Sequence, residues 1–154
     1  MTNPPDLFSF GTLMDTELLP LVCQQDIQTL TLEPATVQNQ ARRWVIDDHY
    51  PVLVPELGSV THGLIIRGLE PEALKRIVFI EGEEFEVQPL EVVRSDGQVE
   101  NVQYFADTHR KTISDTEWSL EEWQRTTKAD TLVRLARYMQ CYGNMTPAEA
   151  DAYW

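Results

Sequence analysis

The sequence predicts an α+β fold in which a strand-rich body is followed by a helical C-terminal appendage. Up to about residue 106, short apolar or alternating runs are separated by turn residues, a pattern typical of strands. From about residue 117 to residue 154 the chain instead carries helix-capping patterns and an apolar helical face. A chain of 154 residues, 42% of them apolar, is long enough to bury one core. Because it has neither an internal repeat nor a low-complexity linker, we expect a single domain over residues 1–154.

The N-terminal part is predicted to form a strand, a tight turn and a short helix. The apolar run Leu7–Phe10 stops at Gly11, and Asp15 is placed as the N-cap of a helix whose inward face begins at Leu18. Residues 24–40 are rich in Gln and Thr and only partly periodic, so no regular element is predicted there.

The middle of the chain is predicted to contain three extended segments, Arg43–Ile46, Tyr50–Pro55 and Val60–Ile66. Prolines bracket the second segment, and β-branched and apolar residues make up most of the third, which is typical of a buried strand.

A helix and a hairpin are expected next. Pro71 lies in the first turn of the helix, where its missing N–H costs nothing. Polar and apolar residues alternate over 84–93, and residues 99–106 supply the return strand across the turn Ser95–Gln98.

The tail is predicted to be helical. Ser119–Glu122 is a capping box, and Thr146–Glu149 repeats the pattern for a short final helix. Trp118 and Trp123 stand at the two positions of a hydrophobic staple. An amphipathic helix bearing tryptophan is typical of a partner site or of a segment that covers its own core, and the second interpretation is favoured here.

The charge of the chain restricts its partners. It has 25 acidic residues against 12 basic ones, a formal net charge of −13. A surface that follows nucleic-acid phosphates needs clustered Lys and Arg, and anionic lipid repels an acidic protein. We therefore expect no nucleic-acid or membrane partner.

The N-terminus and the cysteines indicate a cytoplasmic protein without a metal site. Residues 1–6 lack a basic or apolar leader, and no apolar run is long enough to span a membrane. Cys23 and Cys141 are not spaced as zinc ligands, which leaves two buried thiols or one disulfide as alternatives. Residues Asp47–His49 are also poor metal ligands, because adjacent side chains of an extended chain point to opposite faces.

Two features suggest chemistry. At Gly11 a strand breaks into a helix start, and such a turn presents N–H groups that suit a carboxylate, although many strand–turn–helix junctions bind nothing. Glu81 follows the four apolar residues Ile77–Ile80. If Glu81 is buried, desolvation raises its pKa and makes it a proton carrier near neutral pH. The alternative is a surface glutamate at a helix end, followed by the acidic residues 83–84.

Five segments resemble, in order, the motifs of the γ-glutamylcyclotransferase-like (AIG2-like) proteins. Leu7–Leu13 resembles the Tyr-Gly-Ser/Thr-Leu signature, and Tyr50–Pro55 resembles a Tyr-Pro-x-Leu-x-Pro stretch. Gly63–Ile65 is similar to the strand that follows, Ile77–Phe85 to the Glu-Gly block, and Val102–Tyr104 to a late Val-x-Tyr. The resemblance covers about residues 7–106 and leaves the tail uncovered.

The resemblance implies a compact mixed β-barrel with flanking helices and an enzyme that performs an intramolecular aminolysis. In that reaction the α-amine of a γ-glutamyl group attacks its own side-chain amide, which gives 5-oxoproline and a free amine. The resemblance makes Glu81 the general acid/base and the backbone of residues 11–13 the site of the α-carboxylate. The implied substrate-binding residues are Phe10, Gly11, Thr12, Leu13, Phe85 and Tyr104. No metal or organic cofactor is implied, and the chain is expected to be a monomer or a homodimer.

The chain also departs from the family pattern. Phe10 and Phe85 stand where the family usually has tyrosine, so two hydroxyl groups are missing. The competing hypothesis is therefore a non-catalytic small-molecule binding or interaction module on the same fold.

Overall fold

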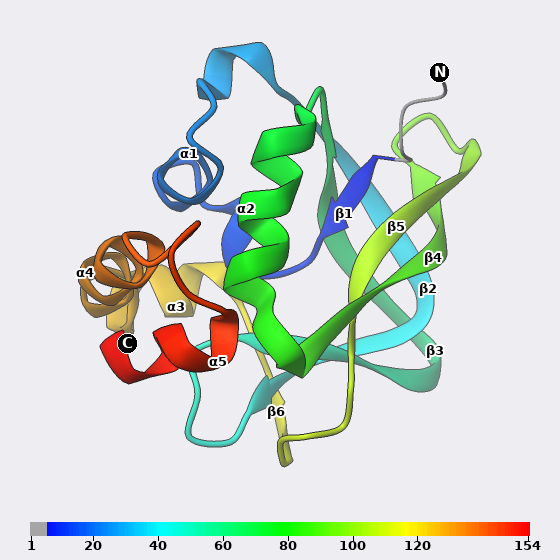
Figure 1. Cartoon of the computed structure of the whole chain (residues 1–154). Helices are drawn as coiled ribbons and strands as arrows, with labels where there is room; N and C mark the ends of the chain where they lie inside the picture. Colours follow the sequence, from blue (N-terminus) through cyan, green and yellow to red (C-terminus); the bar gives the residue numbers. More distant parts are fainter. Residues whose placement is uncertain (1–5) are drawn as a thin grey trace.

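The strands close into a mixed barrel in the computed structural model, which describes residues 6–154 (Figure 1). Residues 1–5, most of the segment inspected for a leader, lie outside the described part. The described strands are β1 (Leu7–Ser9), β2 (Thr31–Val45), β3 (Pro51–Arg67), β4 (Phe85–Arg94), β5 (Val99–Asp107) and β6 (Ile113–Glu117). Their order is β3-β1-β5-β4-β2-β6, and an additional pairing of β2 with β3 closes the first five into a ring. Because β1 runs parallel to β5 and the other pairs are antiparallel, the barrel is mixed, and the predicted fold class is confirmed.

The longest hairpin corrects one prediction. Residues 24–40 are not irregular throughout, because β2 begins at Thr31 and pairs with β3 along most of its length. The register shifts between Gln38 and Gln40, where Asn39 adopts a positive φ of 60°. Only Ala35, Val37, Ala41 and Val45 of β2 are buried, and polar residues occupy 38–40 between them, so the apolar alternation is too sparse to mark a strand in the sequence.

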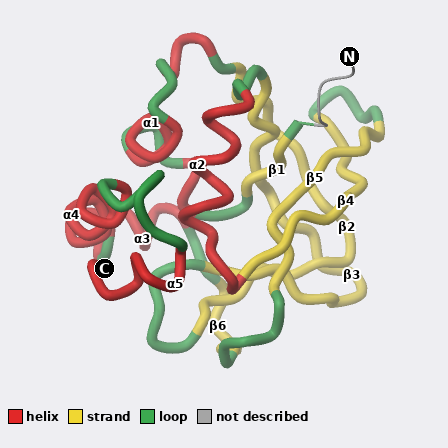
Figure 2. The backbone as a smooth tube through the Cα atoms, in the orientation of Figure 1, coloured by secondary structure: helices red, strands yellow, loops and turns green. Residues whose placement is uncertain are grey.

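The helices lie together on one side of the barrel, as Figure 2 shows. The described α-helices are α1 (Leu18–Cys23), α2 (Pro71–Glu81), α3 (Leu120–Thr126), α4 (Lys128–Met139) and α5 (Pro147–Ala150). Short 3-10 turns add η1 (Thr12–Met14), η2 (Ile27–Thr29), η3 (Gly82–Glu84) and η4 (Asp151–Tyr153). None of the described helices is long and apolar enough to cross a membrane.

The caps of the tail form largely as predicted. Ser119 accepts the backbone N–H of Glu122 at 3.1 Å, and Thr146 and Glu149 complete a reciprocal capping box. Trp118 and Trp123 are fully buried in the main core. The tail therefore covers the core of its own chain.

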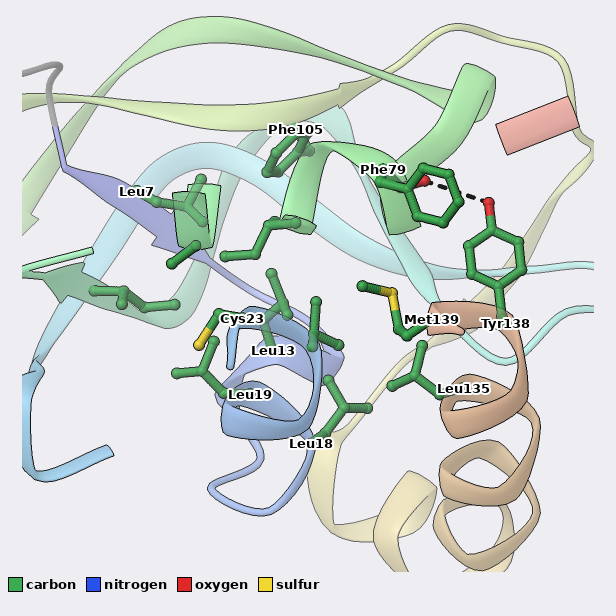
Figure 3. Close-up of a cluster of buried hydrophobic side chains, with 14 of the residues drawn as sticks. Leu7, Leu13, Leu18, Leu19, Cys23, Phe79, Phe105, Leu135, Tyr138 and Met139 are labelled. Carbon is green, nitrogen blue, oxygen red and sulfur yellow. Dashed lines mark hydrogen bonds between the residues drawn. The ribbon is translucent and has the colours of Figure 1, made fainter. Parts of the chain in front are cut away.

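Two apolar cores meet at β1. Leu7 faces the helices and belongs to the larger cluster, part of which Figure 3 shows, whereas Phe8 points into the barrel and belongs to the smaller one. This follows from the alternation of side chains along a strand. Cys23 and Cys141 are both buried free thiols of the larger cluster, which resolves the alternatives left for them.

Candidate functional site

A cavity of about 320 Å³ opens between the barrel and the helices. A smaller cavity of about 40 Å³ adjoins it beneath the end of β1. The residues that line both are Thr12, Leu13, Tyr50, Glu81 and Phe85. Thr12 and Leu13 of the glycine turn therefore line the same two cavities as Glu81, although seventy residues of sequence separate Gly11 from Glu81.

The turn after β1 offers unpaired donors. Met14 N–H and Asp15 N–H donate to the carbonyls of Gly11 and Thr12. In the described part of the chain no acceptor is found for the N–H groups of Gly11, Thr12 and Leu13. A side chain at position 11 would bring its Cβ to 3.1 Å from the Pro51 ring, so glycine permits the close packing of the turn against β3.

Asp15 holds the C-terminal end of the 11–13 turn in place. Its carboxylate is 1% exposed and accepts the N–H groups of Glu17 and Leu18, each at 2.9 Å. The tail contributes Gln124 at 2.9 Å and Lys128 at 3.0 Å. Burial alone would raise the pKa of Asp15, but these partners outweigh it and lower the pKa. The N-cap of α1 is Glu17, so the prediction of Asp15 as the cap was wrong by two residues, and the Asp15 side chain instead ties the turn to the tail.

Arg42 holds the N-terminal end of the 11–13 turn in place. Its guanidinium donates to the backbone carbonyls of Phe10, His62 and Trp118, each at 3.0 Å. In a trans peptide the C=O and the following N–H point in opposite directions. The bond to the Phe10 carbonyl therefore turns the Gly11 N–H away from Arg42. Burial lowers the pKa of Arg42, yet a guanidinium stays protonated, so a positive charge lies behind the turn.

Glu81 is the last residue of α2 and is half-buried. Ile77 and Phe79 anchor this end of the helix in the core. Gly82, at a φ of 62°, lets the chain leave the helix at once, so the Glu81 side chain stays at the cavity. Burial, and secondarily the charge of Glu84, raises the pKa of Glu81 to about 8.

Aromatic rings line both cavities beside the 11–13 turn and Glu81. Tyr50 and Phe85 pack edge to face with centroids 5.3 Å apart, and both line the two cavities. Phe10 lines the smaller cavity and lies 6.3 Å from the ring of Tyr104. Tyr104 itself is not among the lining residues of either cavity. Of the predicted substrate-binding residues, it is the one that the structure does not bring to this space.

The loop between β2 and β3 adds residues that the sequence analysis missed. The chain turns at Asp47, which has a φ of 62°, and both Asp48 and His49 therefore line the larger cavity. The expectation that these neighbours point to opposite faces was wrong because the segment is a turn. Asp48 accepts from His49 at 3.2 Å and lies 3.5 Å from Lys111. Among the described residues, no group of three or more His, Cys, Asp or Glu could hold a metal ion.

The C-terminal tail also lines the larger cavity. Trp154 stacks on His49 with ring centroids 5.0 Å apart and contacts Tyr138 edge to face at 5.9 Å. Arg137 holds the chain end through the backbone oxygens of residues 153 and 154. The tail residues that line the cavity are Thr131, Leu135, Tyr138, Asp151 and Trp154. No motif in the sequence links these positions to residues 11–13 or Glu81.

One known protein family matches most of this sequence. The family model described as "Gamma-glutamyl cyclotransferase, AIG2-like" matches residues 7–125. AIG2-like protein A of Arabidopsis thaliana is 24% identical over 138 residues, which cover 88% of this chain and 82% of that protein. AIG2-like protein B of the same plant is 25% identical over 126 residues, 78% of this chain and 69% of that one.

Solved structures share the fold. An Arabidopsis thaliana protein solved in solution matches with a TM-score of 0.61 and 23% identity, covering 91% of this chain and 93% of its own. A structure named "Gamma-glutamyl cyclotransferase" matches with a TM-score of 0.60 and 10% identity over 96% of this chain and 85% of its own. At such low identity these likenesses show the fold, and the arrangement of side chains has to be argued from this chain.

Proposed function

Because the chain belongs to the gamma-glutamyl cyclotransferase, AIG2-like family, we propose that it is an enzyme that cyclises γ-glutamyl amides or γ-glutamyl amino acids to 5-oxoproline. The observation that carries this proposal is the meeting of the 11–13 turn and Glu81 at one cavity. An anion-binding turn and a proton carrier are the two groups that the reaction requires, and both line a cavity large enough for a small molecule.

The turn binds the substrate by its α-carboxylate. The free N–H groups of Gly11, Thr12 and Leu13 supply donors, and the partly buried charge of Arg42 makes the region behind them positive. This answers the difficulty that an anionic group meets in a protein of charge −13. With the carboxylate held, the flexible γ-glutamyl chain is restricted to the bent conformer in which its amine reaches its amide carbonyl.

Glu81 moves the proton. As a carboxylate it removes a proton from the α-ammonium group, which frees the nitrogen lone pair for attack on the γ-carbonyl carbon. As a carboxylic acid it then protonates the leaving nitrogen while the carbon–nitrogen bond of the amide breaks. Its raised pKa of about 8 suits both roles near neutral pH, since each protonation state is accessible.

The larger cavity receives the leaving amine. Its wall away from the turn consists of the loop at Asp48 and His49 and the tail residues Tyr138 and Trp154. The mixture of aromatic and carboxylate groups there gives the departing group both an apolar surface and hydrogen-bond partners.

The test is release of 5-oxoproline from a panel of γ-glutamyl amides and γ-glutamyl amino acids. We expect the wild-type protein to release it from at least one compound. Glu81→Gln should reduce the rate at least about 10²-fold, the range that loss of general acid–base catalysis produces. Glu91→Gln is the matched control, because Glu91 is an exposed residue of β4 and loses the same charge. Equal rates for wild type and Glu81→Gln would contradict the assignment of Glu81.

One observation favours a second function, a non-catalytic binding module. Phe10 and Phe85 line the smaller cavity with rings that lack the hydroxyl groups usual in the family. Calorimetry on the same panel distinguishes the two functions. Binding of γ-glutamyl compounds without release of 5-oxoproline from any of them would favour the binding module over the enzyme.

A further inference from the structure

We propose that Lys128, the first residue of α4, is a positioning residue for the substrate α-carboxylate, because it cancels the charge of Asp15 beside the 11–13 turn. The inference rests on the part of the proposed function that places the α-carboxylate at this turn. It assigns a role in binding to a tail residue that lines neither cavity and lies beyond the residues that the family model matches.

The turn that receives the carboxylate is closed by Asp15. The Asp15 N–H donates to the Thr12 carbonyl at 3.0 Å, and Asp15 is the C-cap of η1. Because the C=O and the following N–H of a trans peptide point in opposite directions, this bond turns the Leu13 N–H away from Asp15. The residue that orients one donor of the turn therefore also carries a negative charge.

The charge of Asp15 opposes the binding of an anion at the turn. Its carboxylate is 1% exposed, so water screens it little. Two carboxylates that share such a site repel each other, and the substrate brings its own carboxylate to the N–H groups that directly precede Asp15. Without compensation of this charge, the turn would be a poor anion site in spite of its free donors.

Lys128 supplies the compensating charge. Its Nζ lies 3.0 Å from a carboxylate oxygen of Asp15 and 3.0 Å from one of Glu17. Within the described part of the chain, no other basic side chain forms an ion pair with Asp15. Hydrogen bonds to Asp15 and Glu17 raise the pKa of Lys128. Burial would raise the pKa of Asp15, but its hydrogen bonds, one of them from Lys128, lower it, so both partners are charged near neutral pH.

The fold holds Lys128 beside the turn and outside the cavities. The helices α1 and α4 pack against each other and lie side by side in Figure 1. Thr131, one helical turn after Lys128, is 2% exposed and donates its hydroxyl to the Thr127 carbonyl at 3.0 Å, so this end of α4 is packed in place. The Lys128 side chain, 20% exposed, reaches Asp15 from the surface. A substitution at position 128 therefore changes the charge beside the turn and leaves the lining residues of both cavities unchanged.

Gln124 offers a comparison within the same cluster. Its side-chain amide donates at 2.9 Å to the Asp15 oxygen that also accepts Lys128. Gln124 and Lys128 both tie the tail to Asp15, but only Lys128 carries a charge. The two residues therefore separate a mechanical tie from compensation of charge.

The experiment measures by calorimetry the binding of 5-oxoproline, which keeps the α-carboxylate, and of its neutral carboxamide. In the full chain, Lys128→Met should raise Kd for 5-oxoproline about 5- to 10-fold, the low end of typical coupling between two sites, and leave Kd for the carboxamide within about twofold. In turnover of a γ-glutamyl compound it should raise KM and keep kcat, because the carboxylate is held equally in the ground state and the transition state. Lys75→Met is the matched control, since Lys75 is an exposed residue of α2 that lines neither cavity. Its Kd should equal that of the wild type.

Two further variants distinguish charge from structure. Gln124→Met removes a hydrogen bond from the same Asp15 oxygen without a change of charge, so Kd for 5-oxoproline should stay within about twofold of the wild-type value. The double variant Asp15→Asn with Lys128→Met removes both charges and should restore the wild-type Kd. The asparagine keeps an oxygen that can accept the N–H groups of Glu17 and Leu18, so the turn can still close. Melting curves show that each variant is folded.

The outcomes separate this inference from the proposed function. If Lys128→Met binds 5-oxoproline like the wild type, if Gln124→Met weakens binding equally, or if the double variant does not recover, the role of Lys128 is overturned, while loss of turnover in Glu81→Gln still supports the enzyme. If the wild type shows the expected dependence on Lys128 but releases no 5-oxoproline from the panel, the enzyme fails and the inference stands for a binding module. If the wild type binds neither 5-oxoproline nor any compound of the panel, both fail.

Discussion

The two sides of the cavity differ in how they are built. On one side, the turn at residues 11–13 and Glu81 come from segments that carry family motifs, and each side chain is placed by its own element. On the other side, the loop at Asp48 and the tail residue Trp154 meet through a ring stack between distant parts of the chain. The difference shows that the turn and Glu81 are encoded by local patterns, whereas the wall formed by the 48–49 loop and the tail is a product of tertiary packing.

The largest effect that sharpens this comparison is expected from Arg42→Met. The substitution removes the bond that orients the Phe10–Gly11 peptide and the charge behind the turn. KM for a γ-glutamyl compound should rise about 10- to 100-fold, the equivalent of about 1.5–3 kcal/mol for a hydrogen bond to a charged group. Steady-state kinetics measure it, and melting curves report the accompanying loss of stability.

Arg43→Met is the matched control for that prediction. Arg43 is the next residue of β2, but it pairs with Glu56 at 3.1 Å on the surface. Surface ion pairs contribute about 0–1 kcal/mol, so its KM should match that of the wild type. An equal rise of KM in both variants would contradict a specific role for Arg42.

An effect of intermediate size is expected from Trp154→Ala on the other side of the cavity. Removing the ring enlarges the space for the leaving amine, so the ratio of kcat/KM for a bulky over a small leaving group should rise about tenfold. Tyr153→Ala is the control, because Tyr153 is 47% exposed and does not line the cavity. An unchanged ratio in Trp154→Ala would show that the tail does not shape this subsite.

The smallest effect concerns the stability of the free protein. The pKa of Glu81 is raised from 4.5 to about 8 in the folded state, so ionisation is easier in the unfolded chain. The contribution of Glu81 to the free energy of unfolding is therefore greatest below pH 4.5 and is lost as the pH rises toward 8. Glu81→Gln should be more stable than the wild type at pH 9, and the difference should vanish near pH 4. Denaturation curves at the two pH values measure this, and a pH-independent difference would contradict burial of the charge.

Much of the side of the cavity that holds the 11–13 turn and Glu81 could be predicted from the sequence. Gly11 and Glu81 stand in short patterns whose local consequences, a turn and a helix end, do not depend on distant contacts. Arg42 was not predicted as a site residue because its acceptors are backbone carbonyls of three separate segments. Such acceptors leave no pattern of side chains in the sequence. The strand β2 was missed before residue 43 because its few buried residues there, Ala35, Val37 and Ala41, are separated by a polar stretch at 38–40.

The other side of the cavity, formed by the 48–49 loop and Trp154, could not be predicted in the same way. Asp48 and His49 line the cavity only because Asp47 adopts a positive φ, which an extended reading of the segment does not anticipate. The helices of the tail were predicted from their caps and apolar face. That Trp154 would return to His49 depends on how these helices pack against α1 and α2, which no local pattern specifies.

The measurement that tests the central claim most directly is the pH profile of kcat/KM for 5-oxoproline release. This quantity reports the pKa values of the free enzyme and substrate. If Glu81 is the proton carrier at the cavity, the rate should rise with pH along a limb centred near 8, in line with the raised pKa of Glu81, and Glu81→Gln should lack that limb. A profile that is already flat above about pH 5, or a Glu81→Gln variant that keeps the wild-type profile, would contradict the account.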